Sequence, residues 1–278
     1  MTSRLNLRRW PRFGGLVALL GTGAFVLSCR TPSEPAASGR EATISETHGV
    51  GPGPSPGGQP PQSRKWRITP LGDSITGTTC GPQFLSKTLR DHGKTNFVFV
   101  GSNLNDQGCS GAPVVHTEGH GGYLVTDLVG NGQHASKLSQ WCRANAADLV
   151  LMQFGTNDVW SDRSPRAILA AYDAVLAELR KANANVVLLV AQITPLNPSS
   201  CPECESRVVA LNAQIPGWAA RSSTSESPVV VVDLHSAFAG ASYVPSSTYT
   251  PDGVHPNAAG AQLIANQWYA ALTALGIP

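Results

Sequence analysis

Two short segments of the sequence carry the residue types that acyl transfer through a serine requires. Ser74 stands in GDSI at residues 72–75, directly after an apolar run, and His255 follows Asp252 by three residues in DGVHP at 252–256. A carboxylate at this spacing can accept the Nδ1 proton of the histidine, which leaves Nε2 free to take a proton from a serine hydroxyl. Ser74, His255 and Asp252 are therefore the candidate nucleophile, base and orienting carboxylate.

A third segment, GTND at residues 155–158, adds an amide donor. The side chain of Asn157 can donate a hydrogen bond to a developing oxyanion. Each segment also has an ordinary structural interpretation, because Gly-Asp-Ser, Asn and Asp are common in turns and helix caps, and the Asp252 turn can simply cap the last helix. The functional interpretation rests on all three segments adjoining predicted elements, so that they converge on one edge of a sheet.

Strands and helices in alternation must position these residues. The continuous apolar run at 186–190 indicates a strand buried on both faces, and its alternation with helical patterns predicts a parallel, doubly wound α/β sheet. Ligands of such sheets bind beyond the carboxyl ends of the strands. The predicted strands cover residues 66–71, 96–101, 148–154, 186–193 and 229–233, and the predicted helices cover 82–92, 123–129, 137–147, 165–181, 205–220 and 257–275.

Taken in order, GDS, a glycine-bearing second segment, GTND and DGVHP resemble the four blocks of the SGNH (GDSL-type) hydrolases. The resemblance extends over residues 65–278 and implies a three-layer α/β/α sandwich with a five-stranded parallel sheet. It also implies Ser-His-Asp acyl transfer without a metal or organic cofactor. The implied oxyanion hole consists of the Ser74 N–H, the Asn157 amide and a glycine N–H. In HTEGHGGY, at residues 116–123, we choose Gly122 for the last of these, with Gly119 as the alternative.

The flanks of these blocks, such as ITPL at 68–71 and EGHGG at 118–122, resemble more narrowly the acetylxylan esterases of carbohydrate esterase family three. This resemblance implies a serine esterase that removes acetyl groups from a polysaccharide such as acetylated xylan, or from a small ester, through an acyl-enzyme. A lysophospholipase or thioesterase of the same class is one alternative. A non-catalytic carbohydrate-binding module on the same fold is another.

Four further residues have both a structural and a functional interpretation. Asp233 and His235 form a second Asp/His pair, but they lack the turn and the adjoining helix of the Asp252 pair, so we interpret them as structural. Trp160, shortly after Asn157, can stack on the C–H face of a sugar, and packing in the core is the alternative. His120 can touch substrate or cap a loop.

The N-terminal residues predict export. Four arginines precede an apolar run at residues 13–27 that is too short to span a bilayer comfortably, so residues 1–28 are interpreted as a signal peptide. The run ends in VLSC, which resembles a bacterial lipoprotein box and implies a lipid on Cys29; an ordinary signal peptide is the alternative. Residues 29–64 predict a flexible Pro/Gly/Ser-rich tether, and residues 65–278 the catalytic domain. We expect a monomeric cell-envelope lipoprotein or secreted protein, with Cys29 as its sole membrane contact.

Charge and cysteine content narrow the classes further. Without residues 1–28, the 20 basic residues fall to 16 against 18 acidic ones, a net charge of −2, which leaves no basic face to predict nucleic-acid binding. An exported protein can form disulfides, and an odd number of cysteines after Cys29 leaves at least one thiol free if all bridges are internal. CPEC at 201–204 predicts a structural bridge, with a longer bridge or half of a zinc site as alternatives. These later cysteines are Cys80, Cys109, Cys142, Cys201 and Cys204.

Overall fold

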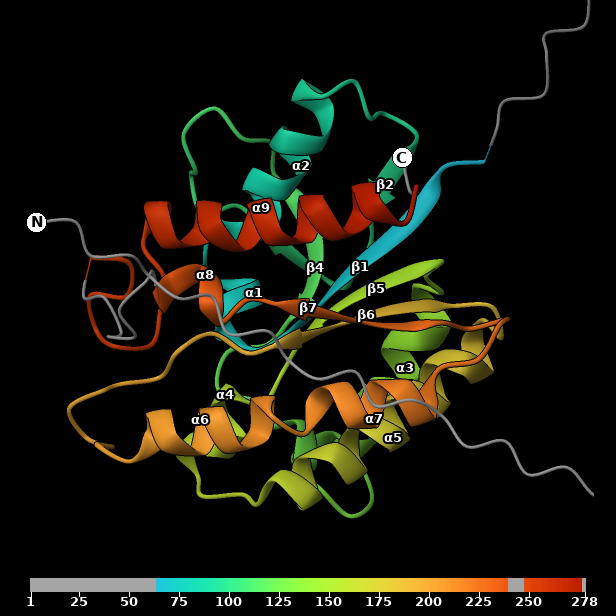
Figure 1. The fold of residues 1–278 in the computed structure, drawn as a ribbon. Helices are drawn as coiled ribbons and strands as arrows, with labels where there is room; N and C mark the ends of the chain where they lie inside the picture. The colour runs from blue at the N-terminus through green and yellow to red at the C-terminus, as the bar shows by residue number, and fades with distance from the viewer. Residues whose placement is uncertain (1–63, 240–247, 277–278) are drawn as a thin grey trace, which may run out of the picture. The chain divides into compact units, whose positions relative to one another are not determined.

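The computed structural model describes residues 64–239 and 248–276, so the predicted signal peptide, Cys29 and nearly all of the tether lie outside the described residues. A seven-stranded sheet is covered by helices on both faces (Figure 1). The strand order is β3-β4-β1-β5-β6-β7, and β2 also pairs with β1. The α/β class with a mostly parallel sheet, predicted from the sequence, is confirmed.

Five parallel strands form the centre of the sheet: β4 (Val115–Gly119), β1 (Trp66–Gly72), β5 (Leu149–Gln153), β6 (Val187–Gln192) and β7 (Val229–Asp233). The predicted strand count of five is wrong, because two short strands join them. β2 (Phe97–Phe99) lies parallel to the first half of β1, and β3 (Asn103–Asn105) pairs antiparallel with β4.

Strand β4 has no counterpart among the predicted strands. It takes over from β2 beside the second half of β1, where Leu71 is opposite Glu118. Its pattern of apolar residues is weak, because Glu118 is among its buried residues. The Glu118 carboxylate accepts a hydrogen bond from the Ser102 N–H and lies beside His120 Nε2. A burial pattern that depends on hydrogen bonds to distant residues leaves no apolar periodicity to detect.

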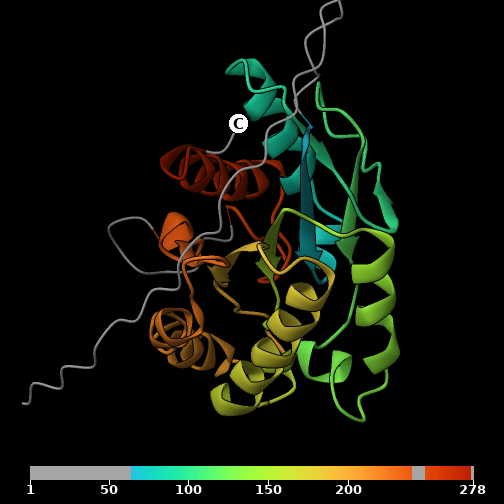
Figure 2. The same cartoon turned by 90° about the vertical axis from the view of Figure 1, so that its right-hand side faces the viewer.

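The helices form two layers, and Figure 2 shows them edge-on on either side of the strands. One layer contains α1 (Ser74–Gly77), α2 (Gly81–Asp91), α8 (Ser236–Ala239) and α9 (Ala258–Ala274). The other contains the short 3-10 helix η1 (Val125–Leu128), α3 (Ala135–Ala144), α4 (Thr156–Trp160), α5 (Pro165–Ala182), α6 (Cys204–Asn212) and α7 (Ile215–Ser222).

Alternate side chains of the central strands build a separate core on each face. Val150 and Met152 pack in the core with Tyr172 and Trp218, whereas Leu149 and Leu151 face the α9 side. Burying one such side chain stabilises the fold by about 1.5–3 kcal/mol. The strands are therefore fixed from both sides, which makes their carboxyl ends a rigid base for a site.

The predicted single helix over 205–220 is wrong, because the chain forms two helices, α6 and α7. Pro216 lies in the first turn of α7, where its missing N–H is harmless. Within a continuous helix its ring would clash with the carbonyl of Asn212, which here accepts a hydrogen bond from the Gln192 side chain instead. None of the helices within the described ranges has the length and apolarity needed to cross a membrane.

Candidate active site

The carboxyl ends of the central strands gather the predicted residues at one end of the sheet. Helices α1, α4 and α8 follow β1, β5 and β7, and all three lie at this end in Figure 1. Ser74 is the first residue of α1, and Asp73 caps this short helix by accepting the Ile75 N–H at 3.0 Å. The half-buried Ser74 hydroxyl lies 2.9 Å from His255 Nε2, although 181 residues separate the two in sequence.

The turn before α9 holds the histidine. His255 Nδ1 lies 2.7 Å from one oxygen of Asp252, whose other oxygen accepts the N–H groups of Val254 and His255. Partial burial tends to raise the pKa of Asp252, but the hydrogen bonds from His255 and Val254 outweigh it and hold this pKa below its ordinary value. The structure thus joins Ser74, His255 and Asp252 in one chain of hydrogen bonds that can pass a proton from serine to imidazole.

Gly253 fastens this turn to the loop that follows β6. Its backbone has a φ of 77°, and a Cβ there would lie 2.2 Å from the carbonyl oxygen of Asn197. The Asn197 N–H in turn donates to the Gly253 carbonyl at 2.8 Å. The backbone approach leaves no room for a side chain, so the position of the Asp252–His255 turn depends on the loop around Asn197.

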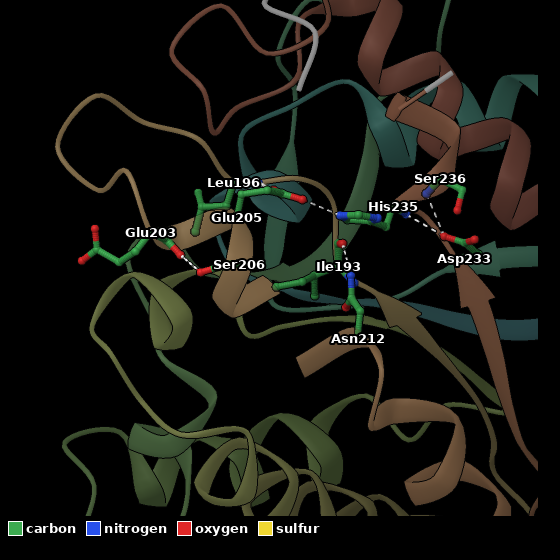
Figure 3. Close-up of polar contacts among 9 residues, drawn as sticks. All are labelled: Ile193, Leu196, Glu203, Glu205, Ser206, Asn212, Asp233, His235 and Ser236. Carbon is green, nitrogen blue, oxygen red and sulfur yellow. Dashed lines mark hydrogen bonds and ion pairs between the residues drawn. The ribbon is translucent and has the colours of Figure 1, made fainter. Parts of the chain in front are cut away.

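That loop is held by a carboxylate–imidazole pair that the sequence analysis did not identify (Figure 3). Glu205, in the first turn of α6, accepts the Leu196 N–H and lies 2.8 Å from His235 Nε2. Asp233 accepts the N–H of His235 and fixes the turn after β7, which agrees with the structural role expected for it. Glu205 thereby ties together α6, the end of β7 and the loop that supports Gly253.

Asn157 lies on the opposite side of the site, in the short helix α4. Its side-chain amide donates to the carbonyl of Tyr123 at 3.0 Å. Tyr123 directly follows the exposed pair Gly121 and Gly122, and a Cβ on Gly121 would lie 3.9 Å from the Cβ of Ser74. The structure therefore brings the Asn157 amide, the turn at Gly121 and Gly122 (the glycine turn) and Ser74 together.

The two candidate glycines differ in their surroundings. Gly119 is buried in β4, its N–H bonds to the Thr117 hydroxyl, and a Cβ on it would lie 2.3 Å from the Gly77 nitrogen. Gly122 is exposed, has a φ of 79°, and a Cβ on it would meet nothing within 4 Å. Among the described residues, the backbone N–H groups of Ser74 and Gly122 donate to no carbonyl. Open space and an available donor favour Gly122 over Gly119.

Asp158 holds the segment that follows the glycine turn through hydrogen bonds. Its fully buried carboxylate accepts the N–H groups of Val125 and Thr126 and the Thr126 hydroxyl. Burial raises the pKa of Asp158, and these hydrogen bonds oppose the shift. Since Asn157 binds Tyr123 while Asp158 binds the start of η1, helix α4 holds the segment after Gly122 at two points.

Stacked aromatic and imidazole rings also hold the glycine turn. His120 stacks on Trp141 at 4.0 Å between ring centroids and on Tyr123 at 5.0 Å, and Tyr123 stacks on His134 at 3.8 Å. His120 Nε2 also lies 2.8 Å from the buried Glu118 carboxylate. His120 and Tyr123 flank the two glycines, so their stacking closes the turn between them.

Asp73, next to Ser74, is a buried acid of a different kind. It is 0% exposed, and one of its oxygens has no hydrogen-bond partner. Burial raises its pKa to about 6, and the hydrogen bond from the Ile75 N–H opposes this shift. This carboxyl group therefore titrates close to neutral pH immediately beside the candidate nucleophile.

The cysteines form two local bridges, Cys80 with Cys109 and Cys201 with Cys204. The longer bridge and the zinc half-site considered for residues 201–204 are therefore wrong. Cys142 is a buried free thiol, and burial raises its pKa to about 12. The part of the chain that the structure describes contains no group of three His, Cys, Asp or Glu side chains placed to bind a metal ion.

Comparison with known proteins places these residues in a family context. A family model described as the GDSL-like Lipase/Acylhydrolase family matches residues 71–263. The chain is 29% identical over 222 residues to a multidomain esterase of Ruminococcus flavefaciens. That match covers 73% of this chain and 28% of the length of the Ruminococcus protein.

Two solved structures share both sequence and fold with the chain. One is a mutant acetyl esterase with an acetate ion, and the other is a carbohydrate esterase family 3 protein from Talaromyces cellulolyticus. Each is 32% identical, with a TM-score of 0.66, and each match covers 76% of this chain and 97% of the solved chain.

Proposed function

Because the chain belongs to the GDSL-like lipase/acylhydrolase family, a family of ester hydrolases, we propose that it is a serine esterase that removes acetyl groups from a polysaccharide such as acetylated xylan. The observation that carries this proposal is the chain of hydrogen bonds from Ser74 through His255 to Asp252. The glycine turn and the Asn157 amide lie beside Ser74, which supports the roles proposed for them as oxyanion donors.

In the first half of the reaction, His255 Nε2 accepts the hydroxyl proton while Ser74 Oγ bonds to the acetyl carbonyl carbon. The carbonyl oxygen becomes an oxyanion, to which the Ser74 N–H, the Gly122 N–H and the Asn157 amide donate. The carbon–oxygen bond to the sugar then breaks, and His255 transfers its proton to the departing sugar oxygen. The products are the sugar with a free hydroxyl group and acetyl-Ser74.

In the second half, a water molecule replaces the sugar. His255 accepts one of its protons while its oxygen attacks the acetyl carbon, and the second oxyanion uses the same donors. The bond to Ser74 Oγ breaks, the serine recovers its proton from His255, and the acetyl group leaves as acetic acid, which ionises to acetate in water. Asp252 stabilises the imidazolium formed in both halves and keeps Nε2 directed at Ser74.

Support for an acetyl group on a carbohydrate comes from relatives. The two solved structures at 32% identity are named an acetyl esterase and a carbohydrate esterase of family 3. The chain matches them over nearly their full length, whereas it corresponds to only 28% of the Ruminococcus esterase. The family itself also includes lipases, so the acyl length has to be measured.

The test compares the full chain with its Ser74→Ala variant on p-nitrophenyl acetate, p-nitrophenyl octanoate and acetylated xylan. Ser136→Ala, which removes an exposed hydroxyl on α3, serves as the control. We expect acetate release from xylan and a preference for the acetyl ester, both lost with Ser74→Ala and unchanged with Ser136→Ala. A preference for octanoate would replace the acetyl assignment, and hydrolysis that survives Ser74→Ala would refute the mechanism.

We also propose that the protein is exported and held at the cell envelope by a lipid on Cys29. The signal-peptide pattern and the lipoprotein-like VLSC segment support this location. The two disulfides of the folded domain are independent support, because such bonds persist in oxidising compartments. An enzyme tethered there would meet polysaccharide outside the cytoplasm.

A further inference from the structure

We propose that Trp160 forms a sugar-binding platform beside the acetyl site and determines the enzyme's selectivity for acetylated carbohydrate over small esters; this inference rests on the proposed function. Trp160 is 38% exposed, so the core-packing alternative for this residue is wrong. It is the one aromatic residue among the exposed large apolar side chains of the described ranges. An exposed indole presents a flat apolar face on which the C–H face of a sugar can pack.

The placement of Trp160 follows from helix α4. Thr156, Asp158 and Val159 are buried, while Asn157 and Trp160 are the two residues of this helix that reach its open face. Residues three apart lie on the same side of a helix, with Cβ atoms about 5–6 Å from each other. Because Asn157 is the candidate oxyanion donor, Trp160 starts from the same side of α4 as a group of the acetyl site.

The segment after Trp160 is held rigidly. Asp162 has a φ of 56°, a left-handed conformation that Asp tolerates better than most residues, and its N–H bonds to the Val159 carbonyl. The guanidinium of Arg207 donates to the Val159 carbonyl and pairs with Asp162. These contacts fix the backbone that carries the indole, which lowers the conformational entropy lost on binding.

Polar groups lie at the same end of α4. Arg207 also pairs with Glu203 at 2.9 Å, so a guanidinium and the carboxylates of Asp162 and Glu203 lie where α6 contacts α4. Ligand sites for polar molecules commonly combine an apolar surface with a few fixed donors and acceptors. The C–H face of a pyranose suits the indole, and its hydroxyl groups suit the charged side chains.

The experiment compares Trp160→Ala and Trp160→Phe with the control Leu275→Ala in the full chain. Leu275 has a similar exposure, 41%, but it caps the far end of α9, a helix of 17 residues. That length places Leu275 about 25 Å from the start of the helix, near which His255 lies. The substrates are acetylated xylo-oligosaccharide and p-nitrophenyl acetate.

We expect Trp160→Ala to lose about tenfold more kcat/KM on the oligosaccharide than on p-nitrophenyl acetate, mainly through KM. Trp160→Phe should keep most of the wild-type kcat/KM on the oligosaccharide. Leu275→Ala should leave kcat/KM unchanged on both substrates. An equal loss on both substrates would overturn the proposal, because it would show that Trp160 only supports the fold or Asn157. An unchanged ratio of kcat/KM between the two substrates in Trp160→Ala would also overturn it. In either case, wild-type hydrolysis that depends on Ser74 would leave the proposed function standing.

A binding measurement tests the platform independently of turnover. In the Ser74→Ala background, calorimetric titration with acetylated xylo-oligosaccharide should give a Kd about tenfold weaker when Trp160 is also replaced by Ala. Equal affinities with and without the indole would overturn the proposal. Sugar binding that needs Trp160 in a protein without Ser74-dependent activity would refute only the proposed function.

Discussion

Gly253 and Asn197 lie in direct backbone contact, and this contact sets the position of the Asp252–His255 turn. We expect Gly253→Ala to lower kcat at least tenfold, because the added Cβ would lie 2.2 Å from the Asn197 carbonyl oxygen and must displace His255 from Ser74. Gly93→Ala is a matched control, since Gly93 has a similar φ of 73° but open space around its Cα. Equal kcat values for the two variants would contradict the expectation.

Asp252→Asn should preserve the turn and yet lower kcat by roughly 10³–10⁴, because its amide presents a donor to His255 Nδ1 and favours the wrong tautomer. The remaining oxygen can still accept the N–H groups of Val254 and His255. Asp233→Asn is the control, because Asp233 also accepts two backbone N–H groups after a strand. Steady-state kinetics and a thermal melt compare the two variants. Similar losses of kcat in Asp252→Asn and Asp233→Asn would argue against an orienting role for Asp252.

Asn157→Ala should lower kcat by about 10²–10³ with little change in KM, since an oxyanion donor acts mainly in the transition state. The lost hydrogen bond to the Tyr123 carbonyl should add a modest decrease in Tm. Asn183→Ala, which removes a similar amide-to-carbonyl bond to Ala147, should lower Tm without this kinetic effect. An effect of Asn157→Ala on KM alone would exclude the oxyanion role.

Asp73→Asn tests the buried carboxyl beside Ser74. Burial raises the pKa of Asp73 from 3.8 to about 6, so its contribution to stability is complete below pH 3.8 and is lost as pH rises through 6. The variant does not ionise, so its free energy of unfolding relative to wild type should increase by up to about 3 kcal/mol between pH 4 and pH 8. Chemical denaturation at several pH values measures this. The exposed Asp106→Asn variant controls for lost charge, and a flat difference for Asp73→Asn would disprove the linkage.

Glu205→Ala should lower both stability and kcat, because it removes the acceptor for the Leu196 N–H and the partner of His235. A buried donor left unsatisfied costs about 1–3 kcal/mol. Glu203→Ala, two residues away and paired with Arg207 at the surface, should change the free energy of unfolding by less than about 1 kcal/mol. Should both variants behave alike on p-nitrophenyl acetate, the loop around Asn197 would not depend on Glu205.

The sequence predicted the parts of the fold in which apolar periodicity is strong. Strands β1, β5, β6 and β7 and the long helices α5 and α9 match their predicted ranges closely, because each buries a continuous face. Strand β4 was missed because polar partners replace apolar contacts at Glu118. The break between α6 and α7 was detectable from Pro216, since proline disrupts a helix interior.

For the site, the motifs indicated Ser74, Asn157, Asp252 and His255, and the sequence favoured Gly122 while Gly119 stayed open as the alternative. Deciding between the two depends on which glycine a neighbouring element covers, and only the packing of Gly119 against Gly77 of α1 reveals it. Glu205 and His235 are 30 residues apart and belong to no recognised motif. A glutamate at the start of a helix is common for electrostatic reasons, so it carries little signal of a distant partner.

The bonding and burial of the other cysteines make a thiol-specific reagent a selective test of the state of Cys29. Four of the five thiols in the described domain are consumed in bridges, and the fifth, Cys142, is buried and protonated at neutral pH. A maleimide reagent added to the folded chain should therefore find one reactive position, Cys29. One label per molecule would identify an unmodified Cys29. No label, together with an intact-mass increase matching acyl chains, would identify the lipidated form without any need to isolate membranes.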